Sequence, residues 1–224
     1  MTPRYAIFAT CKDPLARFGA AWLGWDSVRG VPVTHPDVPG LEVGKITARS
    51  RKYGLHGTLK APFRLASNRE QADLIAAADA LGAQLAPVAI EGLEQSRIGR
   101  FLALTVQGNP AQLDDLAARC VRWFDPYCAP LTDAEVTRRR KARLSARQEL
   151  MLQTWGYPFV MEDFRFHITL TDSMPQDELS RVQDALNTLL PAILPRPFFI
   201  DAITVMRSDA QGRFHQIHRT PLSG

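Results

Sequence analysis

The stretch that decides the fold of this chain reads Tyr53-Gly54-Leu55-His56-Gly57-Thr58-Leu59-Lys60, and a related stretch, Phe164-Arg165-Phe166-His167-Ile168-Thr169-Leu170-Thr171, follows much later. Both contain an apolar residue followed by His-x-Thr-Leu. Successive side chains of a β-strand point to opposite faces, so His56 and Thr58 share one face of their strand, as do His167 and Thr169. Each stretch therefore predicts an amphipathic strand with an imidazole and a hydroxyl on its polar side.

The two stretches belong to a longer duplication. After each histidine strand the chain continues with a helical pattern, a proline, a strand, a Gly-Arg-Phe turn and a returning strand. His56 and His167 lie 111 positions apart (167 − 56), and Gly99 and Gly212 of the turns lie 113 apart (212 − 99). This nearly constant offset predicts an α+β fold that is bilobal and pseudo-symmetric, with two antiparallel sheets flanked by helices around a central cleft.

The duplication also divides the chain. We expect one domain over residues 1–224, with a first lobe at about 50–130 and a second at about 160–224 that includes the N-terminal strand at 4–10. Residues 131–158 form a basic helical connection with six cations between Arg138 and Arg147. Such a segment is either a solvated helix face or a phosphate- or nucleic-acid-contacting surface. Residues 26–50 are rich in Gly and Pro and predict an irregular excursion, either a lid or a plain surface wrap, with one short helix near 42–48.

Helices are expected over 14–25, 67–85, 110–124, 145–155 and 175–190, with a further one opening at Thr132. Capping boxes are predicted at Ser67–Glu70, Thr132–Glu135 and Ser145–Gln148.

Composition is that of a globular protein, with 46% hydrophobic and 22% charged residues. The net charge of +4 and the pI of about 9.2 suit an anionic ligand without by themselves indicating nucleic-acid binding. The three cysteines, Cys11, Cys120 and Cys128, have no zinc-site spacing and predict reduced thiols in a cytoplasmic protein. No signal-peptide pattern or membrane-length apolar run is present, so we expect a cytoplasmic monomer without membrane contact.

Two histidines on facing strands suit an in-line displacement at phosphorus. One neutral imidazole accepts a proton from the attacking hydroxyl or water, and the other, as imidazolium, donates one to the leaving oxygen. The two threonine hydroxyls would donate to the non-bridging phosphoryl oxygens. No metal or other cofactor is expected. A metal set of His35, His215 and His218 is the less favoured alternative to loop or surface histidines.

Strand alternation nominates further substrate-binding residues. Lys60 should lie on the face of the first histidine, and Arg165 and Thr171 on that of the second. Cations there would attract a phosphodiester, although solvated strand-end charges are the plain alternative. Tyr53 and Tyr5 would supply an aromatic wall or a hydroxyl to a sugar, or else pack as aromatics with wet tips.

At these residues the sequence resembles the two-histidine (2H) phosphoesterase superfamily, defined by paired H-x-[T/S]-x motifs, here His56-Gly57-Thr58-Leu59 and His167-Ile168-Thr169-Leu170. Within it, the chain is most similar to a bacterial family named for phosphonate metabolism. The likeness extends to Arg4-Tyr5-Ala6-Ile7, to Ala61-Pro62-Phe63 and to Pro130-Leu131-Thr132-Asp133-Ala134-Glu135.

The resemblance implies a bilobal α+β fold and metal-independent hydrolysis or ring-opening of a cyclic phosphodiester, such as a ribose or nucleotide cyclic phosphate. The expected partner is therefore a small phosphodiester or nucleotide-like substrate. RNA is a less favoured ligand. The competing hypothesis is a non-catalytic RNA- or nucleotide-binding module that uses the same cleft.

Overall fold

The computed structural model describes residues 2–224. Its strands are β1 (Tyr5–Thr10), β2 (Trp25–Asp26), β3 (Val31–Pro32), β4 (His56–Phe63), β5 (Val88–Ile90), β6 (Gly92–Ile98), β7 (Phe101–Gln107), β8 (His167–Thr169), β9 (Phe198–Ile200), β10 (Ala202–Ser208) and β11 (Phe214–Pro221). Its α-helices are α1 (Leu15–Leu23), α2 (Val43–Ile46), α3 (Gln71–Gly82), α4 (Ala111–Trp123), α5 (Asp133–Arg140), α6 (Ala146–Trp155) and α7 (Gln176–Leu189). Short 3₁₀ turns are η1 (Ser50–Tyr53), η2 (Asp125–Tyr127) and η3 (Met161–Asp163).

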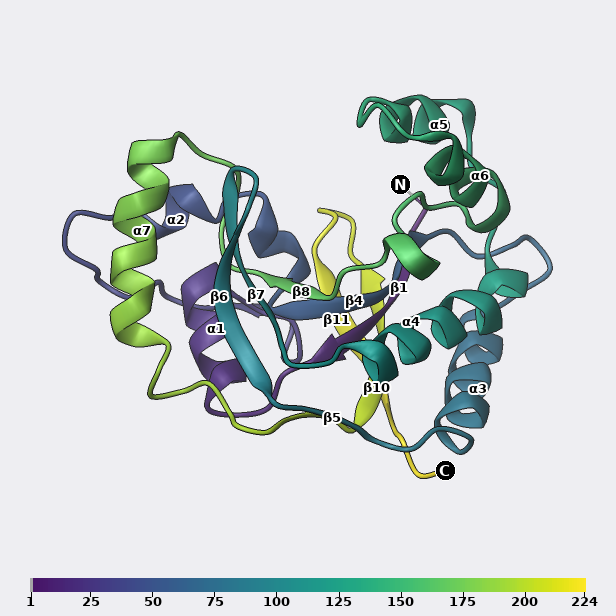
Figure 1. The fold of residues 1–224 in the computed structure, drawn as a ribbon. Helices are drawn as coiled ribbons and strands as arrows, with labels where there is room; N and C mark the ends of the chain where they lie inside the picture. The colour runs from purple at the N-terminus through teal and green to yellow at the C-terminus, as the bar shows by residue number, and fades with distance from the viewer. Residues whose placement is uncertain (1) are drawn as a thin grey trace.

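The centre of the molecule is one antiparallel sheet of seven strands, in the order β11-β10-β1-β4-β8-β7-β6 (Figure 1). The predicted α+β class is confirmed. The expected pair of separate sheets is replaced by a continuous sheet, because the two histidine strands β4 and β8 pair with each other through Gly57 and Ile168. The prediction that these strands face one another across a cleft is therefore wrong, since they are neighbours in one sheet.

The duplication is visible in the strand pairing. Gly57 pairs with Ile168, its own counterpart at an offset of 111, and Ala89 of β5 pairs with Phe199 of β9 at an offset of 110. Pairing between equivalent residues is what a two-fold axis produces. The axis therefore passes between the two histidine strands. The repeats are not identical, because β1 is inserted between β4 and the β10–β11 hairpin.

The halves of this sheet differ from the predicted lobes. The first histidine strand, β4, pairs with β1 and so belongs with β10 and β11, whereas the second, β8, pairs with β7 and belongs with β6. Each histidine strand thus lies in the half built from the other repeat. Local sequence could not reveal this exchange, because strand partners are selected by long-range packing. The N-terminal strand does lie beside β10, as expected.

The two faces of the sheet are unequal. Side chains of α1, α2, α3, α4 and α7 pack with alternate strand residues, including Ile7, Leu59 and Ile168, in the main core. The opposite face carries only a small cluster of Ala6, Phe8, Met206 and Phe214, against which Tyr53 packs. The histidine side chains are on this second face, since His56 stacks on Phe8.

Helix starts follow the predicted signals with one exception. The capping boxes at the start of α5 and α6 are confirmed. The box predicted at Ser67 is wrong, because α3 begins three residues later with Glu70 and Asp73 as the reciprocal pair. The Glu70 carboxylate accepts from the backbone N–H of Asp73, and the Asp73 carboxylate accepts from that of Glu70, so two acidic residues form the capping box.

The irregular excursion folds back onto the sheet and contains the expected short helix, α2. Arg51 holds its end in place: its Nε donates to the Leu23 carbonyl at 3.0 Å and its Nη2 to the Gly44 carbonyl at 2.6 Å. The turn η1 is thereby fixed beside the first histidine strand. In residues 2–224, none of the helices combines the length and apolar character that crossing a bilayer requires.

Candidate active site

The four motif side chains form a square on the open face of the sheet. Because Gly57 pairs with Ile168 in an antiparallel ladder, His56 lies opposite Thr169 and Thr58 lies opposite His167. Side chains opposite each other in such a ladder have Cβ atoms about 5 Å apart. Each imidazole therefore has a threonine hydroxyl two residues along its own strand and another on the neighbouring strand.

Both imidazoles are oriented in the same way by the backbone. The Nδ1 of His56 lies 2.9 Å from the Gly54 carbonyl, and the Nδ1 of His167 lies 2.8 Å from the Arg165 carbonyl. A carbonyl only accepts hydrogen bonds, so each Nδ1 carries the proton. The Nε2 atoms are left for chemistry, and that of His56 lies 3.1 Å from the Thr58 hydroxyl.

Aromatic rings restrain the first histidine further. The ring of Phe8 stacks on His56 with centroids 3.6 Å apart, and Tyr53 lies at 6.0 Å. Phe101 of β7 approaches His167, with ring centroids 6.1 Å apart. The two imidazoles thus have little freedom to rotate, which favours a fixed geometry at their Nε2 atoms.

A cavity of about 390 Å³ opens beside the square, within the size range of small-molecule sites. It is lined by residues of η1, of the first histidine strand and of the segment after β8: Arg49, Ser50, Lys52, Tyr53, Gly54, His56, Phe101, Thr169, Thr171, Asp172 and Ser173. His167 and Thr58 are not among the lining residues, although the strand register places them on the same face of the sheet as His56. The cations of the cavity suit an anionic ligand.

Several of these lining residues could not be predicted from the sequence. Arg49, Ser50 and Lys52 belong to an irregular segment without periodicity, and no local pattern assigns them to the histidines. Asp172 holds that segment in place: its carboxylate accepts from the backbone N–H of Arg49 at 2.7 Å and of Ser50 at 2.8 Å. The position of Asp172, directly after the second motif, is the one signal that could have pointed to it.

The prediction for Lys60 is wrong. Ile7 pairs with Lys60 but Phe8 pairs with Thr58, so a β-bulge at Leu59 breaks the alternation. Lys60 consequently lies on the helix-covered face, where its ammonium donates to the Val121 carbonyl at 2.9 Å. It stabilises the end of α4 and does not reach the histidines.

Tyr5 also lies away from the histidines. It belongs to the main core with Ile7, on the face opposite Phe8, and its hydroxyl lies 3.4 Å from the Gln71 side-chain oxygen. Tyr53, by contrast, lines the cavity, and its role toward a substrate stays a prediction. Tyr5 is thus a packed aromatic with a polar tip.

The two remaining predicted substrate-binding residues, Arg165 and Thr171, make hydrogen bonds within the protein. The exposed Arg165 guanidinium donates to the carbonyls of Glu162 and Phe164, and only its main-chain carbonyl serves His167. Thr171 does line the cavity, but its hydroxyl accepts from the Leu102 N–H at 3.0 Å and fixes the strand edge.

The first histidine is held in its neutral form by its surroundings. Burial lowers the pKa of His56 to about 4; the hydrogen bond to the Gly54 carbonyl opposes this shift, and the nearby His167 adds to it. His56 is therefore neutral at pH 7, with an unprotonated Nε2.

This shift predicts a pH dependence of stability. Between pH 6.5 and 4 the unfolded state protonates His56 and the native state does not, so the free energy of unfolding should fall as pH drops. We expect a contribution of about 2 kcal/mol between pH 7 and 4.5, measured by urea denaturation. Over the same pH interval, the free energy of unfolding of His56→Gln should fall by about 2 kcal/mol less than that of the wild-type protein. An equal loss in both proteins would contradict the assignment.

The remaining histidines do not form a centre. The His35 Nδ1 lies 3.0 Å from the Trp22 carbonyl, and His218 pairs with Asp79. Within residues 2–224, no three His, Cys, Asp or Glu side chains gather in a metal-binding arrangement.

Comparison with known proteins places this chain in a family. A family model described as Protein of unknown function (DUF1045) matches residues 58–215. A protein of Janthinobacterium sp. (strain Marseille) called ribose 1,5-bisphosphate phosphokinase PhnN is 38% identical over 231 residues, covering 99% of this chain and 51% of that protein. One of the same name from Laribacter hongkongensis (strain HLHK9) is 31% identical over 179 residues, covering 79% and 42%. The chain thus spans about half the length of these relatives, or less.

Two solved structures align over nearly the whole chain. The protein TT0787 of Thermus thermophilus has a TM-score of 0.47 at 15% identity, covering 99% of this chain and 98% of its own. A protein described as a phosphoesterase has a TM-score of 0.44 at 13% identity, covering 99% of both chains. The family model matches more than half of the chain, so the chain belongs to the family described as Protein of unknown function (DUF1045).

Proposed function

We propose that the chain is a phosphodiesterase that opens a cyclic phosphodiester by paired histidine acid–base catalysis. The observation that carries this proposal is the pairing of Gly57 with Ile168, which brings both His-x-Thr motifs onto one face of the sheet. With each Nδ1 bound to a backbone carbonyl, both Nε2 atoms remain available to a substrate. A lone histidine would not support this reaction, which needs an acid and a base together.

The neutral form of His56 supports its role as the base and leaves the role of the acid to His167. His56 is neutral at pH 7, so its Nε2 takes the proton of an attacking water, and the water oxygen forms the new bond to phosphorus. His167, as imidazolium, gives its Nε2 proton to the ring oxygen as the bond from that oxygen to phosphorus breaks. The product is a phosphate monoester and a free hydroxyl. The proton gained by His56 and the one lost by His167 are exchanged with solvent.

The threonines and cations bind the phosphate. In the free protein the Thr58 hydroxyl is hydrogen-bonded to the His56 Nε2. When substrate binds, a phosphoryl oxygen would accept this hydrogen bond in place of the imidazole. Thr169 offers a second hydroxyl from the cavity wall, and Lys52 lines the same cavity. Donors placed where charge develops in the transition state are the largest usual catalytic contribution.

We infer a ribose cyclic phosphate as the substrate. The chain corresponds to about half of a relative that is named ribose 1,5-bisphosphate phosphokinase. Opening a 1,2-cyclic phosphate of ribose 5-phosphate at the O2 bond would produce that bisphosphate. In such a relative, the half that corresponds to this chain would produce ribose 1,5-bisphosphate, and the other half would phosphorylate it. This is a simple reason for the two halves to be joined in one protein. A nucleotide cyclic phosphate is the second candidate, because the same histidines would act on it.

The test is a product analysis by ³¹P NMR. Ribose 5-phosphate 1,2-cyclic phosphate and 2′,3′-cyclic AMP are each incubated with the protein, with and without EDTA. We expect faster opening of the first, with phosphate retained at O1 and no effect of EDTA. Phosphate retained at O2, or opening of the nucleotide alone, would contradict the substrate assignment. Binding of either compound without turnover would instead support the non-catalytic alternative.

A further inference from the structure

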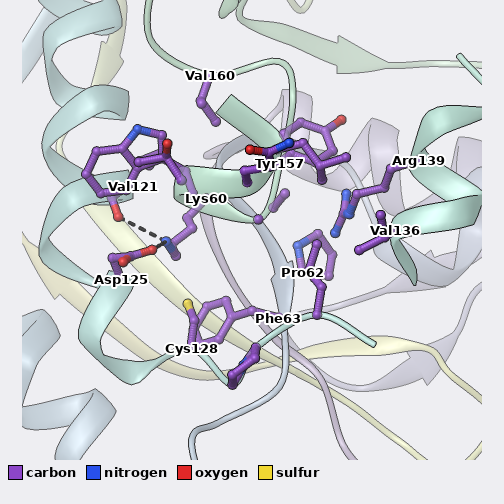
Figure 2. A pocket seen from close by; sticks show the side chains of 18 of the residues that line it. Lys60, Pro62, Phe63, Val121, Asp125, Cys128, Val136, Arg139, Tyr157 and Val160 are labelled. Carbon is purple, nitrogen blue, oxygen red and sulfur yellow. Dashed lines mark hydrogen bonds and ion pairs between the residues drawn. The ribbon is translucent and has the colours of Figure 1, made fainter. Parts of the chain in front are cut away.

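A second cavity of about 350 Å³ lies away from the motif square, between the C-terminal part of β4, the end of α4 and the α5–α6 pair (Figure 2). Figure 2 shows Lys60 and Asp125 at one side of it and Arg139 and Val136 at the other. Much of the rest of its wall is apolar or aromatic, including Pro62, Phe63, Trp155 and Tyr157. A mixed wall of this kind is typical of sites for small organic ligands.

Arg139 differs from the arginines around it. Arg140 is paired with Glu149 and Arg147 with Glu162, so these two cations serve the surface of the helical connection. The Nε of Arg139 is buried and has no hydrogen-bond partner within residues 2–224. A buried donor without a partner is costly, and a ligand that accepts from it would recover that free energy.

The guanidinium of Arg139 is held in position by an aromatic ring. Its carbon lies 4.8 Å from the centroid of the Tyr157 ring, a cation–π contact that restrains the guanidinium. A guanidinium has N–H donors in a planar fork that matches two oxygens of a phosphate. Arg139 is therefore preorganised to bind an oxyanion.

A second cation stands at the other side of the cavity. The buried Lys60 ammonium donates to the Val121 carbonyl and lies 3.6 Å from the Asp125 carboxylate, so its charge is largely compensated. Arg140 is paired with Glu149, so among the described residues Arg139 is the lining cation that forms no ion pair within 4 Å. The aromatic residues Phe63 and Trp155 belong to the same wall and offer surface to a planar ring.

We propose that this cavity is a second ligand site, which binds an aromatic phosphate such as a nucleoside monophosphate. The phosphate is bound by Arg139, and the planar ring packs against Trp155 and Phe63. The proposal is independent of the reaction at the histidines. It gives a role to the one arginine of the basic connection that is turned into the protein.

Isothermal titration calorimetry of the whole chain with AMP tests the proposal. We expect saturable one-to-one binding, with adenosine and inorganic phosphate each at least ten-fold weaker because each lacks one half of the ligand. Arg139→Gln should weaken AMP binding at least ten-fold. Arg138→Gln, which alters the exposed neighbour, should leave it unchanged. Val136→Phe, which fills the cavity and retains Arg139, should also abolish binding.

His167→Ala separates this site from the motif square. AMP binding that survives His167→Ala and is lost in Val136→Phe supports a distinct site. Binding that is lost in His167→Ala, or that persists unchanged in both Arg139→Gln and Val136→Phe, overturns the proposal, as does the absence of AMP binding. Far-UV circular dichroism of each variant checks that α5 and α6 remain folded.

Discussion

Replacement of either His56 or His167 with alanine should lower the rate of ring opening by about 10³-fold, within the usual contribution of a positioned acid or base. Each imidazole presents an Nε2 from a ring fixed by a backbone carbonyl, so no neighbouring group can substitute for it. The double variant should be little worse than either single one, because the acid and the base act as a unit. Initial rates with ribose 5-phosphate 1,2-cyclic phosphate give the measurement.

The control for these variants is His215→Gln. His215 lies on β11 at the edge of the sheet, four strands from the second motif, so its replacement should leave kcat within two-fold. The pH dependence of kcat/KM supplies a second check, since loss of His56 should remove the limb that reports the base. Full activity in both alanine variants would exclude the two-histidine mechanism.

Gly57→Ala should destabilise the protein by about 3 kcal/mol, at the upper end of the cost of overpacking a core. A Cβ at this position would lie 2.2 Å from two ring carbons of Phe166, which is itself buried in the main core. Either the ring must move or the two histidine strands must separate. Since Gly57 forms the pair that joins them, activity should fall as well, by about 10² for a displacement of 1 Å.

Urea denaturation and kcat of the folded protein together test this expectation. The matched comparison is Gly44→Ala in α2, where an added Cβ would lie 3.3 Å from the His35 ring; a small shift of that ring relieves this contact, so the loss of stability should be well below that of Gly57→Ala. The double variant Gly57→Ala/Phe166→Leu should recover part of the stability, because leucine vacates the space of the ring. Unchanged stability and activity in Gly57→Ala would show that the strands tolerate separation.

The elements of the candidate site that depend on local periodicity could be predicted from sequence. Alternation along a strand places His56 with Thr58 and His167 with Thr169, and the constant offset between the repeats identifies them as equivalents. The helix starts at Thr132 and Ser145 are equally local, because a capping box is made within four residues. Each of these signals is contained in a short stretch of chain.

The predictions are wrong where the position of a side chain depends on residues far away in the sequence. Lys60 leaves the expected face because β4 accommodates an extra residue against β1, and a bulge of this kind depends on both strands. Arg49 and Lys52 reach the cavity because Asp172, more than a hundred residues later, binds the backbone of their segment. The register of β1 against β4 places Phe8 against His56. Tyr5, three residues earlier, therefore points to the opposite face and into the main core.

The sequence by itself thus determined the chemistry available to this protein: two imidazoles and two hydroxyls, paired along amphipathic strands and repeated once. Only the tertiary structure decided that the two strands are neighbours, that each belongs to the half built from the other repeat, and which cations accompany them. The physical reason is that a strand carries its alternation in its own residues, whereas its partner, its register and its bulges are chosen by the packing of the whole core.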